Sequence, residues 1–231
     1  MLSLIYRKLK YFRALLYDFF IFSLTSHWYR EVLLECPVGT RMLDVGIGTA
    51  TSLIDNSHIL FSKHISVVGV DYDLDYVKRA KINIAKNGNL QYVVRVKHAN
   101  IHDFNADFSE KFDVIYFSGS FMAIKNQTEA LRHCTRMLRD PTSKAQDECT
   151  IFFSQTFEKR TLLGNYVTPF IKQFLKFLTT IDFGIVTYED DFRDVLERAG
   201  IEILRFKTLK NSYIRSQAIV MAHPKLCKVD T

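Results

Sequence analysis

An apolar run followed at once by two closely spaced glycines constrains this chain more than any other feature. The run from Met42 to Val45 is typical of a strand, Gly46 and Gly48 follow it, and the segment 50–60 is compatible with a helix. Glycines in a strand-to-helix turn let a ligand approach the backbone, and the helix offers unpaired N–H groups and the positive end of its dipole. The pattern predicts a ligand site here, although glycines chosen only for positive φ would give a similar turn.

A second strand pattern supports the ligand interpretation. The run from Ile65 to Val70 is apolar and leads directly to Asp71, and a helical pattern begins near Leu74. A carboxylate at the tip of a second parallel strand can accept hydrogen bonds from ribose hydroxyls, and its charge strengthens them. Asp71 or Asp73 could instead cap the following helix, and both roles are compatible if each acid takes one.

These two motifs resemble those of the class I S-adenosylmethionine-dependent methyltransferases. The first motif of that family reads acidic-x-Gly-x-Gly-x-Gly, and this chain has Asp44, Gly46, Gly48 and, in place of the third glycine, Ala50. A nicotinamide or flavin site begins similarly with Gly-x-Gly-x-x-Gly. In that register the third position is Thr51, whose β-branched side chain would disturb close packing of helix against strand.

The resemblance implies S-adenosylmethionine as cofactor, released as S-adenosylhomocysteine. It also implies a donor site built from the loops after the first four strands. On the positions that match the family, the expected cofactor-binding residues are Asp44, Gly46, Gly48, Thr49, Asp71, Tyr72, Asn100, Ile101, Ser118 and Gly119. No metal ligand set is expected.

The loop after the third strand departs from the family pattern. Relatives often have Gly-Asp followed by an apolar residue, with the acid on the adenine amino group, whereas this chain has Asn100 followed by Ile101. The Asn100 oxygen can still accept from an amino group but carries no charge, and Ile101 would pack on the adenine face. Asp103 is the other candidate for the adenine contact. An ordinary polar surface loop is the alternative for His98, His102 and Asp103.

Apolar periodicity gives alternating strands and helices along most of the chain. Such alternation predicts a mostly parallel sheet with helices on both faces, and a final hairpin after five parallel strands is what the methyltransferase fold has. We therefore expect an α/β fold, Rossmann-like and doubly wound, with a seven-stranded sheet and a C-terminal antiparallel hairpin. The expected strands are 41–45, 65–70, 91–97, 112–117, 150–156, 201–208 and 213–222, and the expected helices are 2–22, 28–34, 50–60, 74–85, 127–138 and 188–199.

Size and composition agree with a single catalytic domain. The 231 residues are 48% hydrophobic, which excludes global disorder, and the four cysteines form no Cys-x-x-Cys pair. The net charge of +6 permits an acidic partner without indicating one. We expect an N-terminal helical lid over residues 1–36 and a methyltransferase domain over 37–231, with a helical insert at about 158–184.

The sequence does not name a methyl acceptor. Nucleic-acid amino-methyltransferases typically carry Asn/Asp/Ser-Pro-Pro-aromatic after the fourth strand, where this chain has Ser118-Gly119-Ser120-Phe121, so a nucleic-acid partner is disfavoured. We expect transfer to a nitrogen or oxygen of a small apolar or aromatic molecule. A lipid, quinone or protein acceptor is the first alternative, and a domain that uses the donor for other chemistry is the second. No catalytic residue is assigned, and His102, Tyr116 and Glu158 are only candidates for a base.

The acceptor pocket is expected from the N-terminal helices and the insert. In the insert, aromatic and aliphatic side chains recur at helical spacing, which fits either a stripe facing the core or a lid over the acceptor: Phe170, Phe174, Phe177 and Ile181. The segment 1–26 is basic first and apolar later, and its uncharged run is shorter than the ~20 residues of a membrane span. A docked helix that closes the donor pocket is favoured, with a helix lying on an anionic membrane as the alternative. A cytoplasmic location is expected, with a peripheral membrane or organellar one left open, and the oligomeric state is not predicted.

Overall fold

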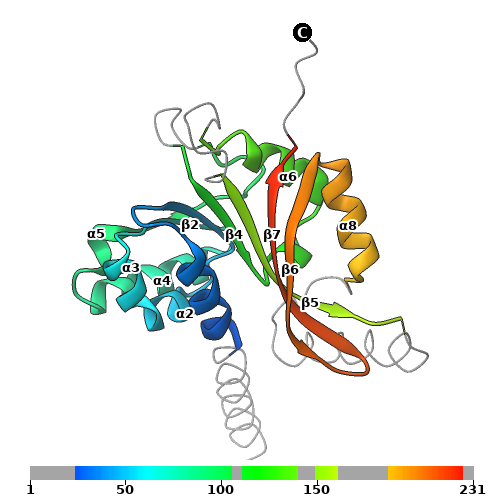
Figure 1. Cartoon of the computed structure of the whole chain (residues 1–231). Coiled ribbons are helices and arrows are strands. Elements are labelled where there is room, and N and C mark those ends of the chain that lie inside the picture. The colour runs from blue at the N-terminus through cyan, green and yellow to red at the C-terminus, as the bar shows by residue number, and fades with distance from the viewer. Residues whose placement is uncertain (1–23, 106–110, 140–148, 161–186, 226–231) are drawn as a thin grey trace, which may run out of the picture.

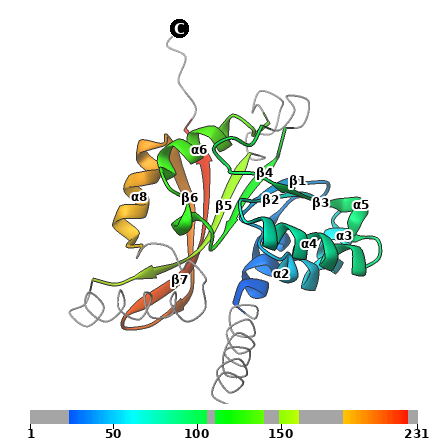
Figure 2. The same ribbon diagram turned by 180° about the vertical axis from the view of Figure 1, so that it is seen from behind.

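A computed structural model describes residues 24–105, 111–139, 149–160 and 187–225 (Figures 1 and 2). The strands of these residues form one sheet of seven in the order β3-β2-β1-β4-β5-β7-β6. Its parallel strands are β1 (Arg41–Val45), β2 (Ser66–Asp71), β3 (Val94–His98), β4 (Val114–Ser118) and β5 (Thr150–Glu158). The last two strands, β6 (Ile201–Asn211) and β7 (Arg215–Pro224), form an antiparallel hairpin whose β7 also runs antiparallel to β5. The expected Rossmann-like fold is confirmed.

Helices cover both faces of the sheet. They are α2 (Thr51–Asp55), α3 (Ser57–Ser62), α4 (Leu74–Lys86), α5 (Leu90–Val93), α6 (Gln127–Thr135), α8 (Glu189–Arg198) and the short 3-10 helix η1 (Phe121–Ala123). Residues 24–35 are also helical. In Figure 1, α2 to α5 gather beside the end of the sheet that holds β2, and α8 lies beside β6 at the other end.

Alternating side chains of the strands feed two separate cores. On one face, Leu43 of β1 and Phe153 of β5 pack with residues of α6 and α8. On the other, Met42 and Phe152 pack with α2, α3, α4, α5 and the helix 24–35. Neighbouring strand residues point to opposite faces, so each strand contributes side chains to both cores. The two glycines follow the last residue of β1 and therefore lie at the edge of the sheet, between the cores. The carboxyl ends of the parallel strands meet at that edge.

Two elements differ from the sequence expectation. The predicted helix 50–60 is two helices, because the Asn56 side chain donates to the backbone oxygens of Ser26 and Ser52, 2.9 Å away in each case, and the helical path breaks at Asn56. The predicted strand 91–97 begins only at Val94, since residues 90–93 form a helical turn and Tyr92, whose alternation suggested a strand, is 75% exposed.

The ends of other elements also shift. Strand β6 continues to Asn211 rather than ending at 208, and β7 begins at Arg215 rather than 213, with a turn at residues 212–214 that is closed by the Ser212 N–H donating to the Arg215 carbonyl. Helix α6 ends at Thr135 rather than 138, and β5 runs through Glu158, where the insert was expected to begin. The expected helix 2–22 and the aromatic residues of the insert lie outside the described residues.

Candidate active site

The loop after β1 takes three left-handed backbone positions in five residues. Gly46, Gly48 and Ala50 have φ of +80°, +59° and +59°. A Cβ on Gly46 would lie 2.4 Å from the Cβ of Ser120, so the loop after β4 presses against this turn. A Cβ on Gly48 would meet nothing within 4 Å, so the backbone there borders open space. Ala50, which replaces the family's third glycine, bears a left-handed conformation that costs an alanine about 1–2 kcal/mol.

Asp71 connects this loop to the end of β2. One carboxylate oxygen accepts the Gly48 N–H at 2.9 Å, and the other accepts the Asp73 N–H at 2.9 Å. Burial raises the pKa of Asp71, while the two backbone hydrogen bonds oppose that rise. Asp73 accepts from the N–H groups of residues 75 and 76 and is the N-cap of α4. The prediction that one of the two acids caps this helix is therefore confirmed, with Asp73 as the cap. Each Asp71 oxygen keeps one lone-pair site beyond the bond it already makes.

A buried polar cluster lies at the ends of β1, β4 and β5 under the helix 24–35. Asp44 is fully buried, and one of its oxygens accepts the Tyr29 hydroxyl at 2.7 Å. The Tyr116 hydroxyl and the Ser154 Oγ are 2.9 Å apart, and the rings of Tyr29 and Tyr116 meet edge to face at 5.1 Å. Desolvation raises the pKa of Asp44 to about 7, against a lowering effect of the Tyr29 hydrogen bond. The carboxyl group therefore titrates near neutral pH.

Several buried polar atoms near the carboxyl edge of the sheet have no hydrogen-bond partner within the described part of the chain, those of Asp44 and Trp28 at the helix 24–35 and those of Gln155 on the opposite face. They are the second oxygen of Asp44, the Trp28 Nε1 and both amide atoms of Gln155. Buried polar groups are satisfied in most native structures, because an unpaired one costs folding free energy. Their concentration at the carboxyl edge of the sheet indicates that a ligand completes the site, since ligands of open α/β sheets bind at that edge.

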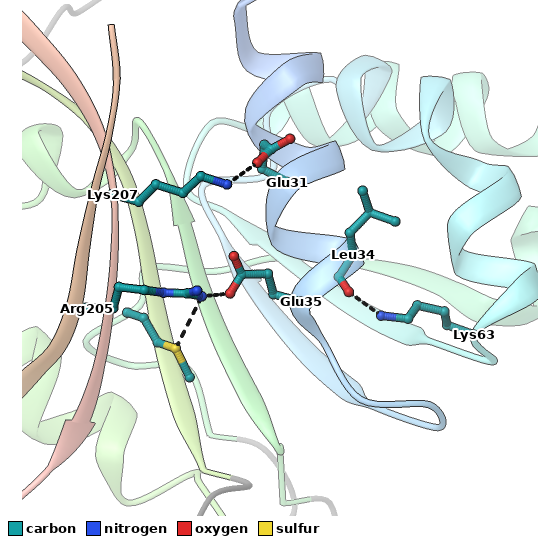
Figure 3. Close-up of polar contacts among 7 residues, drawn as sticks. Glu31, Leu34, Glu35, Lys63, Arg205 and Lys207 are labelled. Atoms are coloured by element: carbon teal, nitrogen blue, oxygen red, sulfur yellow. Dashed lines mark hydrogen bonds and ion pairs between the residues drawn. The ribbon is translucent and has the colours of Figure 1, made fainter. Parts of the chain in front are cut away.

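The helix 24–35 covers the site and is held by contacts along its carboxyl-terminal half. Figure 3 shows Glu31 paired with Lys207 and Glu35 paired with Arg205, both basic residues coming from β6. The Lys63 ammonium donates to backbone carbonyls at the carboxyl end of the helix. Its positive charge also interacts favourably with the negative end of the helix dipole there. These contacts fix the helix above the sheet and place the Trp28 ring 3.2 Å from a Cβ built on Gly119.

The remaining expected cofactor residues lie at the same edge with different degrees of exposure. Thr49 shares a 2.7 Å hydroxyl contact with Thr51. Tyr72 is 69% exposed, and its carbonyl lies 2.9 Å from the His98 ring nitrogen. The Asn100 side chain is exposed and accepts the His102 N–H at 3.2 Å.

The other expected site residues are Ile101, Gly119 and the candidate bases. Ile101 is 6% exposed and packs in the core that faces α6. The Gly119 N–H donates to the Ser154 carbonyl at 2.8 Å, which extends the ladder between β4 and β5 beyond Ser118. Among the candidate bases, His102 has a ring nitrogen 2.8 Å from the Lys125 carbonyl, and Tyr116 is buried with a raised pKa.

A family model described as a methyltransferase domain matches residues 38–200. This chain belongs to the class I S-adenosylmethionine-dependent methyltransferases. Its cofactor is S-adenosylmethionine, and the match includes every expected cofactor-binding residue. None of the curated proteins compared with the sequence matches it.

Solved structures with the same fold carry different activities in their names. An S-adenosylmethionine-dependent methyltransferase from Aquifex aeolicus superposes with a TM-score of 0.58 at 19% identity, over 84% of this chain and 88% of that one. An arsenic(III) S-adenosylmethionine methyltransferase from Chlamydomonas reinhardtii gives 0.57 at 15%, over 83% and 65%. The [4+2]-cyclase SpnF gives 0.64 at 14%, over 87% and 80%. At these identities the likeness establishes the fold alone.

The residues of this methyltransferase fit the donor that the family uses. The unpaired Asp44 oxygen is an acceptor for an ammonium group, and Gly48 leaves room where a side chain would fill the space. Asp71 retains acceptor capacity for ribose hydroxyls beside that opening.

Within the described ranges, no helix is both long and apolar enough to cross a bilayer.

Sequence reasoning missed the contribution of the helix 24–35. Trp28 and Tyr29 were expected to lie in a helical segment, but nothing in the spacing connected Tyr29 to Asp44, fifteen positions away. Gln155, like Glu158 and Asp182, is a polar residue near the ends of the insert that could orient an acceptor amine or hydroxyl, and the spacing does not single it out. Its position on β5 after a run of phenylalanines, where an apolar residue would be usual, was the available signal.

Proposed function

We propose that this methyltransferase moves the methyl group of S-adenosylmethionine to a nitrogen or oxygen of a small, largely apolar or aromatic molecule. The proposal is supported by the enclosure of the site, which is covered by buried side chains. Trp28 and Tyr29 are each 3% exposed over the site, and the unpaired second oxygen of Asp44 and the Trp28 Nε1 are buried there. A small molecule suits a closed site of this kind better than a nucleic-acid base, whose extrusion requires a dedicated recognition region.

The proposed chemistry asks the protein mainly for orientation. The donor, when bound, supplies an activated methyl group on a sulfonium. Asp44 would hold the ammonium through its free oxygen, and Asp71 would hold the ribose. Once the acceptor is also held in line with the donor's methyl group, alignment of the two reactants can contribute roughly 7–11 kcal/mol to the lowering of the barrier. Tyr29 keeps the Asp44 carboxylate in one orientation by donating to its other oxygen.

The donor site is tested by calorimetric titration with S-adenosylmethionine. We expect Gly48→Val to abolish binding, because a branched side chain would occupy the open space beside the backbone. Gly88→Val is the matched control, since Gly88 has the same φ of +59° and a Cβ there also meets nothing within 4 Å, but it lies after α4 and away from the loop. Unchanged affinity in Gly48→Val, or equal loss in both variants, would contradict the assigned site.

The ribose contact is tested separately. Asp71→Ala is expected to weaken donor binding by about 1.5–3 kcal/mol, the usual value of a hydrogen bond to a charged group. Equal affinity of the wild-type protein for S-adenosylmethionine and a ribose-deoxy analogue would refute this role. Methyl-labelled donor incubated with metabolite pools then identifies the acceptor.

A lipid, quinone or protein acceptor remains the second candidate, because the sequence of residues 1–26 is basic and then apolar. Liposome co-sedimentation of the full chain and of a chain without residues 1–26 separates the two proposals. Loss of sedimentation on truncation favours the membrane-docked enzyme. Loss of donor binding without a change in sedimentation favours the closing helix.

A further inference from the structure

Gln155 is a fully buried amide placed among aromatic side chains. It is 0% exposed, and neither its nitrogen nor its oxygen has a hydrogen-bond partner within the described part of the chain. The register between β5 and β7 is unbroken from Ile151 to Glu158, so side chains alternate strictly between the two faces. Gln155 therefore shares its face with Phe153, Phe157 and its cross-strand partner Ala218.

That face is apolar. The Phe153 ring contacts those of Phe121 and Phe192 at centroid distances of 5.0 and 5.2 Å, and Phe157 contacts Phe192 at 5.2 Å. An unpaired amide in such surroundings costs folding free energy, whereas a leucine or methionine would not. The position therefore carries a stability penalty that packing does not explain.

The strand lengths place Gln155 at the edge where acceptors approach. The last ladder pair between β4 and β5 joins Ser118 to Ser154, and β5 continues to Glu158. Gln155 is the first β5 residue beyond that pair, next to the turn that holds Gly119 and Ser120. It lies at the carboxyl edge, where ligands of open α/β sheets bind.

We propose that Gln155 determines acceptor specificity by hydrogen bonding to the methyl acceptor, an inference that rests on the proposed function. A carboxamide offers both donor and acceptor atoms, so its complement is a group that does both, such as a hydroxyl or another amide. The partner group is neutral, because the neighbouring side chains on this face, Phe153, Phe157 and Ala218, offer no counter-charge.

Gln155→Met tests the inference, because methionine keeps the length of the side chain and removes its polar atoms. Gln127→Met is the matched control: the Gln127 amide donates to the Phe121 carbonyl at 2.7 Å and is already paired. In urea unfolding of the ligand-free protein, we expect Gln155→Met to raise the midpoint and Gln127→Met to lower it. A lowered midpoint in both variants would show that the Gln155 amide is paired within the protein and would overturn the inference.

The functional arm uses methyl-labelled S-adenosylmethionine with a protein-free metabolite extract. We expect Gln155→Met to bind the donor with wild-type affinity by calorimetry, yet to form the wild-type labelled product at least tenfold more slowly. Formation of that product at the wild-type rate would overturn the inference. Failure of the wild-type protein to bind S-adenosylmethionine would instead refute the proposed function, so the two failures are distinguishable.

Discussion

Removing the Tyr29 hydroxyl should destabilise the protein in a pH-dependent way. In Tyr29→Phe the buried Asp44 loses the one hydrogen-bond partner that the described structure gives it, so that both of its oxygens are then unpaired. A hydrogen bond to an ionised group contributes about 1.5–3 kcal/mol, and one between neutral groups about 0.5–1.5 kcal/mol. The loss should therefore be larger at pH 8.5, where Asp44 is ionised, than at pH 5.5, where it is protonated.

The sign of this dependence follows from the pKa of Asp44. Burial raises that pKa from 3.8 to about 7 in the folded protein. The folded state then holds its proton more tightly than the unfolded state. The stability that this group contributes is present below about pH 4 and is lost as the pH rises through 7. The difference between the folded and unfolded pKa of Asp44 corresponds to about 4 kcal/mol of folding free energy. Because the Tyr29 hydroxyl lowers the folded pKa, Tyr29→Phe should raise it further. The variant should then lose more stability than the wild type as the pH rises, and over a higher pH range.

Urea unfolding at the two pH values measures the effect, and Tyr116→Phe is the matched control. Tyr116 is as deeply buried on the same face, but its hydroxyl pairs with the neutral Ser154 at 2.9 Å. We expect Tyr116→Phe to cost about 0.5–1.5 kcal/mol at both pH values. Equal destabilisation by Tyr29→Phe at pH 5.5 and 8.5, or the same pH dependence in both variants, would refute the reasoning.

Three further outcomes test other parts of the site. Gly46→Ala should lower the free energy of unfolding by about 2–5 kcal/mol, because of its left-handed backbone and the overlap with Ser120. Gly39→Ala, where φ is +81° and a Cβ has no neighbour within 4 Å, should lower it by only about 1–2 kcal/mol. Similar losses for the two variants in urea unfolding would show that Ser120 moves aside at little cost. Asp73→Ala should lose the cap of α4, about 1 kcal/mol by thermal unfolding, without weakening donor binding, and a weaker donor affinity would assign Asp73 to the ligand. Donor affinity, measured by calorimetry, should rise roughly eightfold between pH 6 and 7.5 as Asp44 ionises, and Asp44→Asn should abolish that rise. A flat wild-type profile would exclude Asp44 as the ammonium partner.

The local motifs of the chain determined its fold class and the place of its donor site. Strand, glycine turn and helix follow one another within about twenty residues at the first motif, so backbone sterics and apolar periodicity suffice to predict them. The second motif works in the same way, because the acid comes directly after its strand. Parallel order then brings the Gly48 N–H to Asp71, a contact that the β-α-β unit makes almost unavoidable.

Tertiary structure decided which side chains lose water and which remain unpaired. The Tyr29 contact with Asp44 depends on how the helix 24–35 lies over the sheet, and the ion pairs with β6 that hold this helix join residues more than 160 positions apart. The isolation of Gln155 depends on rings from η1, β5 and α8 meeting on one face. Burial and hydrogen-bond satisfaction are properties of the packed chain, and no periodicity in a sequence encodes them.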